Sequence, residues 1–150
     1  MANYRSILAS VLAIVAVLFI CFSDPAVAKT VKKLTYTPQQ LEEIQTSMSD
    51  VAEMRDRFPE LKALIDQKDD MFTRNFIHGP LGELRVKLSS VARNLLPDAQ
   101  KQARQLAKDV ANDLVRIDQA AASRDFTLAS RYYNETLKDL DAFEQLLPKS

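Results

Sequence analysis

The scarcity of glycine limits what this chain can fold into. Only two glycines occur in 150 residues, Gly79 and Gly82, and they stand almost together. A β-sheet protein needs many turns, and turns draw heavily on glycine. Alanine, leucine, glutamine and charged residues are abundant, and 47% of the residues are hydrophobic, which is enough for one buried core. We therefore predict an all-α protein with a single folded domain.

The composition also excludes several classes of function. The chain has 20 basic and 20 acidic side chains, so it lacks the strong positive charge of a general nucleic-acid binder. One cysteine cannot form an internal disulfide, and one histidine cannot supply a multi-histidine metal cluster. No motif around His78 supports a catalytic arrangement. Counting alone leaves a Ser-His-Asp or Cys-His arrangement open, and we expect no nucleic-acid partner and no directly bound cofactor.

The N-terminus has the pattern of an export signal. Arg5 precedes an uncharged apolar run, and the sequence AVA at residues 26–28 is a small-x-small cleavage site. The apolar run over residues 7–22 has 16 residues, fewer than the roughly 20 that a membrane-spanning helix needs. We predict a signal peptide over residues 1–28 and an exported mature chain. An uncleaved N-terminal anchor is the alternative.

Cys21 raises a second possibility for the N-terminus. It follows the apolar run directly, which resembles the lipid-attachment site of bacterial lipoproteins. Leu18 matches that pattern, whereas Ile20 departs from it because the residue before the cysteine is normally small. Cys21 is therefore a candidate for lipid attachment, with a lipoprotein signal ending before it. An ordinary apolar cysteine inside the signal peptide is the alternative.

The remaining chain has the apolar spacing of helices. Residues 29–37 are polar and lysine-rich, and we expect a flexible arm there. Thr37-Pro38 then provides a helix cap followed by proline at the first helical position. Apolar residues recur at steps of three and four through four stretches, separated by breaks near 67–70, 96–98 and 123–125.

Short connections between these stretches favour antiparallel neighbours. We predict an up-down-up-down antiparallel four-helix bundle over residues 38–150. The first helix should be kinked or interrupted at Phe58-Pro59, and the second should be distorted at His78–Gly82. Leu41 and Phe72 belong to the apolar stripes of these two helices. The leucines expected in the core are Leu84, Leu88, Leu106, Leu114, Leu137 and Leu140.

Several segments resemble the cyanobacterial form of the PsbQ family, CyanoQ. The central segment is IHGPLGELR at Ile77–Arg85, followed by Leu95-Leu96-Pro97. Further matches are LAKDV at 106–110, IDQAA at 117–121, Tyr132-Tyr133 and FEQLLP at 143–148. The resemblance covers roughly residues 36–148 in the same order.

The resemblance implies a non-catalytic extrinsic subunit of photosystem II in the thylakoid lumen, peripheral to the thylakoid membrane. Such subunits help to stabilise the oxygen-evolving complex and affect its calcium and chloride requirement indirectly. The implied partners are lumenal subunits of photosystem II and the thylakoid membrane surface, the latter through a lipid on Cys21. The alternative is a generic exported or lipid-anchored helical-bundle binding protein with another partner.

Charge is unevenly distributed along the chain. Residues 71–108 carry seven basic and two acidic side chains, whereas the segments on either side are net negative. Lys101, Arg104 and Lys108 are spaced i, i+3 and i+7, so they form one stripe on a helix. A basic band of this kind can orient docking on an acidic partner, and charge balance between neighbouring helices is the alternative. The candidate docking residues are Arg85, Lys87, Arg93, Lys101, Arg104 and Lys108.

Two other groups of residues invite a metal interpretation. His78 is a weak metal candidate, because zinc needs several nitrogen, sulfur or oxygen ligands and only carboxylates lie near it in sequence. We expect His78 to brace the distortion beside it. The aspartates after residue 108 are spread along helices rather than gathered in a calcium-binding loop, so most should form a solvated face.

Overall fold

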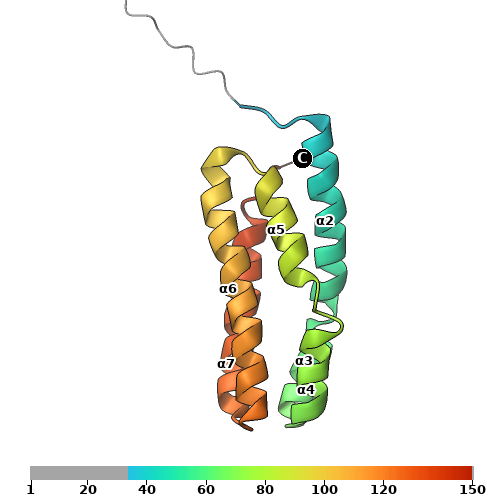
Figure 1. Ribbon diagram of the computed structural model, residues 1–150, viewed down its shortest axis with the longest axis vertical. Coiled ribbons are helices and arrows are strands. Elements are labelled where there is room, and N and C mark those ends of the chain that lie inside the picture. Colours follow the sequence, from blue (N-terminus) through green and yellow to red (C-terminus); the bar gives the residue numbers. More distant parts are fainter. Residues whose placement is uncertain (1–33, 150) are drawn as a thin grey trace, which may run out of the picture. The chain divides into compact units, whose positions relative to one another are not determined.

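The computed structural model describes residues 34–149, and in that range it contains helices and no strands (Figure 1). The all-α prediction is confirmed. Of the predicted four-helix bundle, the helical content is confirmed. The up-down-up-down arrangement of four helices is not, because the first two predicted helices are each divided in two. The helical segments are α2 (Pro38–Asp56), α3 (Phe58–Asp66), α4 (Asp70–His78), α5 (Leu84–Asn94), α6 (Pro97–Ala122) and α7 (Phe126–Glu144).

Helices α6 and α7 pack against each other along their length, and the other helical segments complete the core (Figure 1). α2 packs on α5, α3 packs on α4 and α7, and both α4 and α5 pack on α6. Arg55 near the end of α2 forms ion pairs with Asp141 and Glu144 of α7. The signal peptide, Cys21 and residues 29–33 of the predicted arm lie outside the described residues.

α2 begins where the sequence predicts. Thr37 is the N-cap and Pro38 is the first helical residue. The Gln40 backbone N–H donates to Thr37 Oγ1 at 3.2 Å, and the Thr37 N–H donates to Gln40 Oε1 at 2.9 Å. This reciprocal capping box satisfies backbone donors that the first helical turn would otherwise leave unpaired.

The predicted interruption at Phe58-Pro59 separates α2 from α3 at Arg57. Proline has no backbone N–H and cannot continue the hydrogen-bond ladder from the preceding turn. The apolar stripe nevertheless continues across the break, with Val51, Phe58 and Leu61 all fully buried. The prediction that this stripe faces the core is wrong at its first residue, because Leu41 in the first turn of α2 is 43% exposed.

The predicted distortion after His78 separates α4 from α5. Gly82 is required there, because a Cβ atom at this position would lie 2.7 Å from the His78 carbonyl oxygen. Leu81 and Leu84 beside the glycine are buried and hold the irregular segment against the core. Phe72 was expected in the buried stripe, but it lies in the first turn of α4 and is 57% exposed.

The chain makes two tight turns at one end of the bundle without glycine. Lys68 and Arg124 both have a φ of 58°, the left-handed conformation that usually favours glycine. After each of them, an aspartate caps the next helix: Asp69 accepts from the Phe72 N–H, and Asp125 accepts from the Leu128 N–H.

Hydrogen bonds of the Schellman type explain how both turns form. The Lys68 and Asp69 N–H groups donate to the Ile65 and Leu64 carbonyls. The Arg124 and Asp125 N–H groups donate in the same way to the Ala121 and Ala120 carbonyls. These bonds satisfy carbonyls at the ends of α3 and α6 and offset the backbone strain. The predicted breaks near 67–70 and 123–125 are confirmed.

Most of the predicted core leucines are buried, namely Leu84, Leu88, Leu114 and Leu140. Leu106 and Leu137 are only partly buried, although they pack against the core cluster. Smaller buried residues, such as Ala103 and Ala107, bring α6 close to its neighbours. Among the described helices, none is both long enough and apolar enough to cross a membrane.

Candidate partner-docking surface

Side-chain hydrogen bonds from the first turns of α6 hold the connection between α5 and α6. The Gln100 side-chain amide donates to the carbonyl oxygens of Arg93 at 2.9 Å and Leu95 at 2.8 Å. Arg104 Nη2 in turn donates to Gln100 Oε1 at 2.8 Å. Gln100 therefore connects the Arg104 side chain on α6 to the last turn of α5.

Five of the six predicted docking residues are exposed cations on these two helices. We call them the cation face. Within residues 34–149, no carboxylate lies within ion-pair distance of any of them. Charge balance inside the described part of the chain therefore does not account for this surface. The cation face consists of Arg85, Arg93, Lys101, Arg104 and Lys108.

Lys87 differs from the other five predicted docking residues. Its Nζ atom lies 2.6 Å from Asp50 Oδ2 on α2, and its side chain is 30% exposed. The hydrogen bond to Asp50 raises the pKa of the Lys87 ammonium. The charge of Lys87 is therefore balanced by a neighbouring helix, which is the alternative to docking that the sequence left open.

The outer row of α6 continues beyond Lys108 with the uncharged residues Ala111 and Val115 and then reaches Asp118, which pairs with Arg74. Val115 is 53% exposed, and Val86 in the first turn of α5 is 62% exposed. The surface of α5 and α6 thus combines cations that have no ion-pair partner among residues 34–149 with exposed apolar side chains. This chemistry suits an acidic partner surface that also offers apolar contacts.

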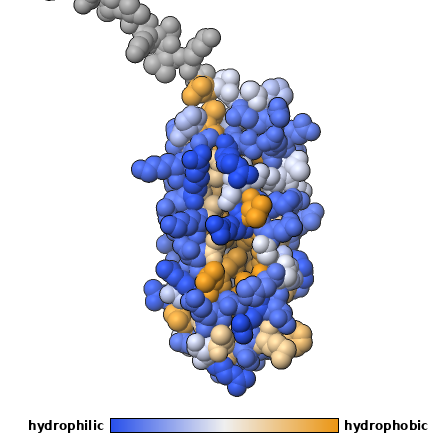
Figure 2. Space-filling view, in the orientation of Figure 1, coloured by the Kyte–Doolittle hydropathy of each residue, from blue (hydrophilic) through white to orange (hydrophobic). Residues whose placement is uncertain are grey.

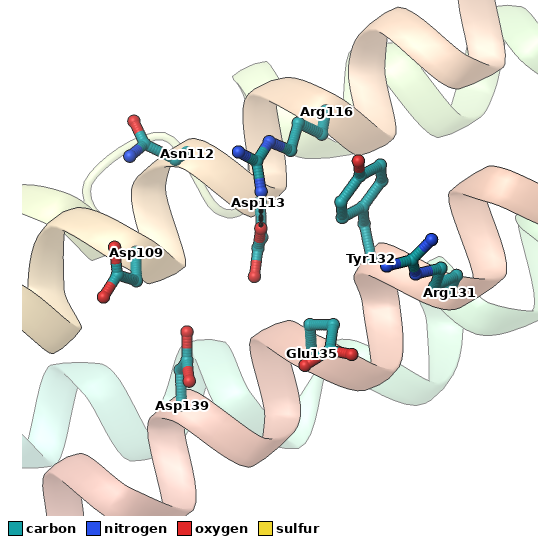
Figure 3. Close-up of a pocket in the computed structure, with 8 residues that line it drawn as sticks. All are labelled: Asp109, Asn112, Asp113, Arg116, Arg131, Tyr132, Glu135 and Asp139. Atoms are coloured by element: carbon teal, nitrogen blue, oxygen red, sulfur yellow. Dashed lines mark hydrogen bonds and ion pairs between the residues drawn. The ribbon is translucent and has the colours of Figure 1, made fainter.

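A flank of α6 next to the cation face is turned towards α7 across an acidic pocket (Figure 3). Asp113 at its centre is only 6% exposed, and Arg116 Nη1 donates to Asp113 Oδ1 at 3.1 Å. The Arg116 guanidinium also lies over the Tyr132 ring, 5.1 Å from its centroid. The pocket is lined by Asp109, Asn112, Asp113 and Arg116 of α6 and by Arg131, Tyr132, Glu135 and Asp139 of α7.

The pocket raises the pKa of two carboxyl groups. Burial is the main cause of the raised pKa of Asp113; Glu135 and Asp109 raise it further, and Arg116 acts against them. Burial also raises the pKa of Asp139, with added repulsion from Asp113 and Asp109. The pocket therefore holds carboxylates that repel one another across the α6–α7 interface.

The sequence interpretation missed this pocket. It treated most aspartates of the C-terminal half as a solvated face, and for Asp113 this is wrong. A signal was present, because Asp113 lies three residues after Val110 and four before Ile117, both fully buried. An acidic residue at that spacing shares the core side of the helix.

His78 joins the end of α4 to α6. Its Nε2 atom lies 2.9 Å from Asp118 Oδ1, and Arg74 Nε donates to the same oxygen at 3.2 Å. These contacts fix the last turn of α4 beside the irregular segment that follows it. Within the described residues, no group of three or more histidine, cysteine, aspartate or glutamate side chains is placed to hold a metal ion.

The fold and the cation face define a small all-helical protein with five exposed cations on two adjacent helices. The family model PsbQ, described as oxygen evolving enhancer protein 3, matches residues 11–148. CyanoQ of Synechocystis sp. is 36% identical over 151 residues, which cover 100% of this chain and 99% of that protein. The chain therefore belongs to the PsbQ family of photosystem II extrinsic proteins, as its central segments predict.

Proposed function

We propose that this protein is a non-catalytic extrinsic subunit that docks on the lumenal side of photosystem II through the cation face. The observation that carries the proposal is a set of five exposed cations on α5 and α6 that form no ion pair within residues 34–149. Membership of a family of extrinsic photosystem II proteins supplies the class of partner.

Docking of this kind stabilises the oxygen-evolving complex from outside. The bound subunit covers part of the lumenal surface and slows the loss of calcium and chloride, and it ligates neither ion itself. Exposed charge contacts speed association and are weakened by salt, with a Debye length of about 10 Å at 0.1 M ionic strength. A lipid on Cys21 would add attachment to the thylakoid membrane that salt does not disrupt.

Reversing the α6 stripe tests the docking surface. The variant Lys101→Glu/Arg104→Glu/Lys108→Glu should bind photosystem II membranes depleted of the native subunit more weakly at low salt. Its helical circular dichroism should be unchanged, because all three side chains are exposed. If the variant binds these membranes as tightly as the wild type does, the stripe faces solvent and takes no part in docking.

A matched control separates local from overall charge. Lys68→Glu/Lys138→Glu makes the same change in net charge as the double variant Lys101→Glu/Lys108→Glu, at exposed lysines that also form no ion pair within residues 34–149. These positions lie outside the cation face, so binding of this control should stay close to the wild-type value. Equal loss in both double variants would indicate general electrostatic attraction in place of a docking face.

Deleting the gene tests the stabilising role. Photosystem II should still assemble, and its oxygen evolution should become more sensitive to calcium or chloride depletion. An unchanged response, together with absence of the protein from purified photosystem II, would favour an exported helical binding protein with another partner.

A further inference from the structure

Apolar side chains gather at the end of the bundle where the described chain begins. Leu34 is 63% exposed and Leu41, in the first turn of α2, is 43% exposed. An apolar groove of about 400 Å³ lies between α2 and the C-terminal residues. Figure 2 shows hydrophobic surface at the end of the molecule next to the start of the described chain. The terminal patch comprises Leu34, Leu41, Met48, Leu147 and Pro148, and the buried Ile44 also lines the groove.

The chain outside the described residues indicates what covers this patch. The apolar run ends at Phe22, and 11 residues separate it from Leu34. A chain of that length spans at most about 40 Å when fully extended. If the run stays in a bilayer, or Cys21 carries a lipid, the terminal patch is therefore held within that distance of the membrane.

The charges that precede the patch in the sequence or border its groove also fit a bilayer surface. Lys29, Lys32 and Lys33 precede it in the sequence, and Lys149 borders the groove. Cations beside exposed apolar residues are typical of segments that lie at the membrane interface. Glu42 and Glu43 are exposed on the neighbouring flank of α2, so this contact should not depend on anionic lipid.

We propose that the terminal patch rests on the lipid bilayer, with Leu34, Leu41 and Leu147 among the headgroups and upper acyl chains. This inference rests on the membrane attachment included in the proposed function, and it adds which end of the bundle the membrane contacts. The opposite end, where Met71 and Phe72 are exposed beside the two glycine-free turns, then points away from the lipid.

The absence of tryptophan from the sequence gives a direct test. Leu41→Trp places a single tryptophan in the patch, and Met71→Trp places one at the opposite end; both replace exposed apolar side chains. The full chain, with its N-terminus as produced by the cell, is mixed with phosphatidylcholine vesicles that carry bromine in the upper acyl chains. The fluorescence of the Leu41→Trp variant should be quenched by the bromine atoms, and its emission maximum should shift to shorter wavelength. The fluorescence of the Met71→Trp variant should be unaffected.

A second variant distinguishes contact by the patch from tethering alone. Leu34→Gln/Leu147→Gln in the Leu41→Trp background should still sediment with the vesicles but lose most of the quenching. If the Leu41→Trp protein sediments with the vesicles but is quenched no more than the Met71→Trp protein, the patch does not contact the bilayer. That result would overturn the inference and leave the tether intact. A blue shift that depends on protein concentration and not on lipid would overturn it in favour of a second copy of the chain.

Failure of the protein to sediment with vesicles would overturn both the tether and the patch contact. Docking through the cation face is measured separately on photosystem II, so that part of the proposed function would stand or fall independently.

Discussion

The two sides of α6 carry opposite kinds of charge, although the chain as a whole is neutral. Its outer row bears Lys101, Arg104 and Lys108 with no carboxylate among them, and all three are exposed. The side that faces α7 contributes Asp109 and Asp113 to a pocket with further carboxylates.

The difference shows what each side can do. Cations left in water are readily available to a partner, because binding need not break an existing ion pair. Carboxylates enclosed between two helices lose hydration and repel one another, and they therefore act mainly on stability and its pH dependence. One helix thus separates a surface suited to binding from an interface that adjusts the fold.

The largest expected effect concerns the core that both sides share. Leu114 is 6% exposed, and Leu114→Ala should lower the free energy of unfolding by about 2–5 kcal/mol if the site cannot collapse. Leu106→Ala should cost less, because Leu106 is only partly buried. Urea unfolding followed by circular dichroism measures both values. Equal losses would contradict the burial difference along α6.

The next effect tests the acidic side. Arg116→Met removes the ion-pair partner of the buried Asp113 carboxylate, and a buried group left without its partner costs about 1–3 kcal/mol. Arg131→Met is the matched control, because Arg131 also lies over the Tyr132 ring and forms no ion pair within the described residues. We expect the control to lose clearly less stability in the same urea experiment. A larger loss for Arg131→Met would show that the ring contact matters more than the carboxylate.

A smaller effect appears in the pH dependence of stability. The pKa of Asp113 and that of Asp139 are raised in the folded protein, chiefly by burial, so the folded state binds these protons more tightly than the unfolded chain does. Their contribution is fully present below the unfolded pKa of about 4 and is lost as pH rises through the folded values. Asp113→Asn/Asp139→Asn should therefore flatten the fall in stability as pH rises above about 4.

Thermal unfolding at several pH values measures this slope. Asp56→Asn, at the exposed end of α2, is the control and should keep the slope of the wild type. If the pocket double variant also keeps it, burial and repulsion in the pocket do not raise the pKa of these carboxyl groups enough to affect stability.

The helices were predictable from the sequence because their signals are local. The Thr37-Pro38 cap, the apolar spacing and the break at Phe58-Pro59 each depend on residues close together in the chain. Leu41 and Phe72 were assigned to the core wrongly for one reason, since both lie in a first helical turn at an end of the bundle, where fewer neighbours cover them.

The sites were less predictable because they depend on which helices become neighbours. The stripe on α6 follows from spacing within one helix, and the structure exposes all three of its residues. The pairing of Lys87 with Asp50 joins residues from α5 and α2, and the acidic pocket joins α6 and α7. Spacing within one segment cannot reveal contacts of this kind.

The smallest expected effect separates a paired cation from an unpaired one. Lys87 and Lys108 are lysines on adjacent helices, but only Lys87 has a carboxylate partner among the described residues. Lys87→Met should lower stability slightly, since exposed ion pairs contribute little, and it should leave docking on photosystem II unchanged. Lys108→Met should do the reverse: stability stays the same, and association at low salt slows, because surface charges act mainly on the association rate. If Lys87→Met slows association as much as Lys108→Met does, the docking surface extends around α5 towards α2, and ion pairing within the chain does not decide which cations are available to a partner.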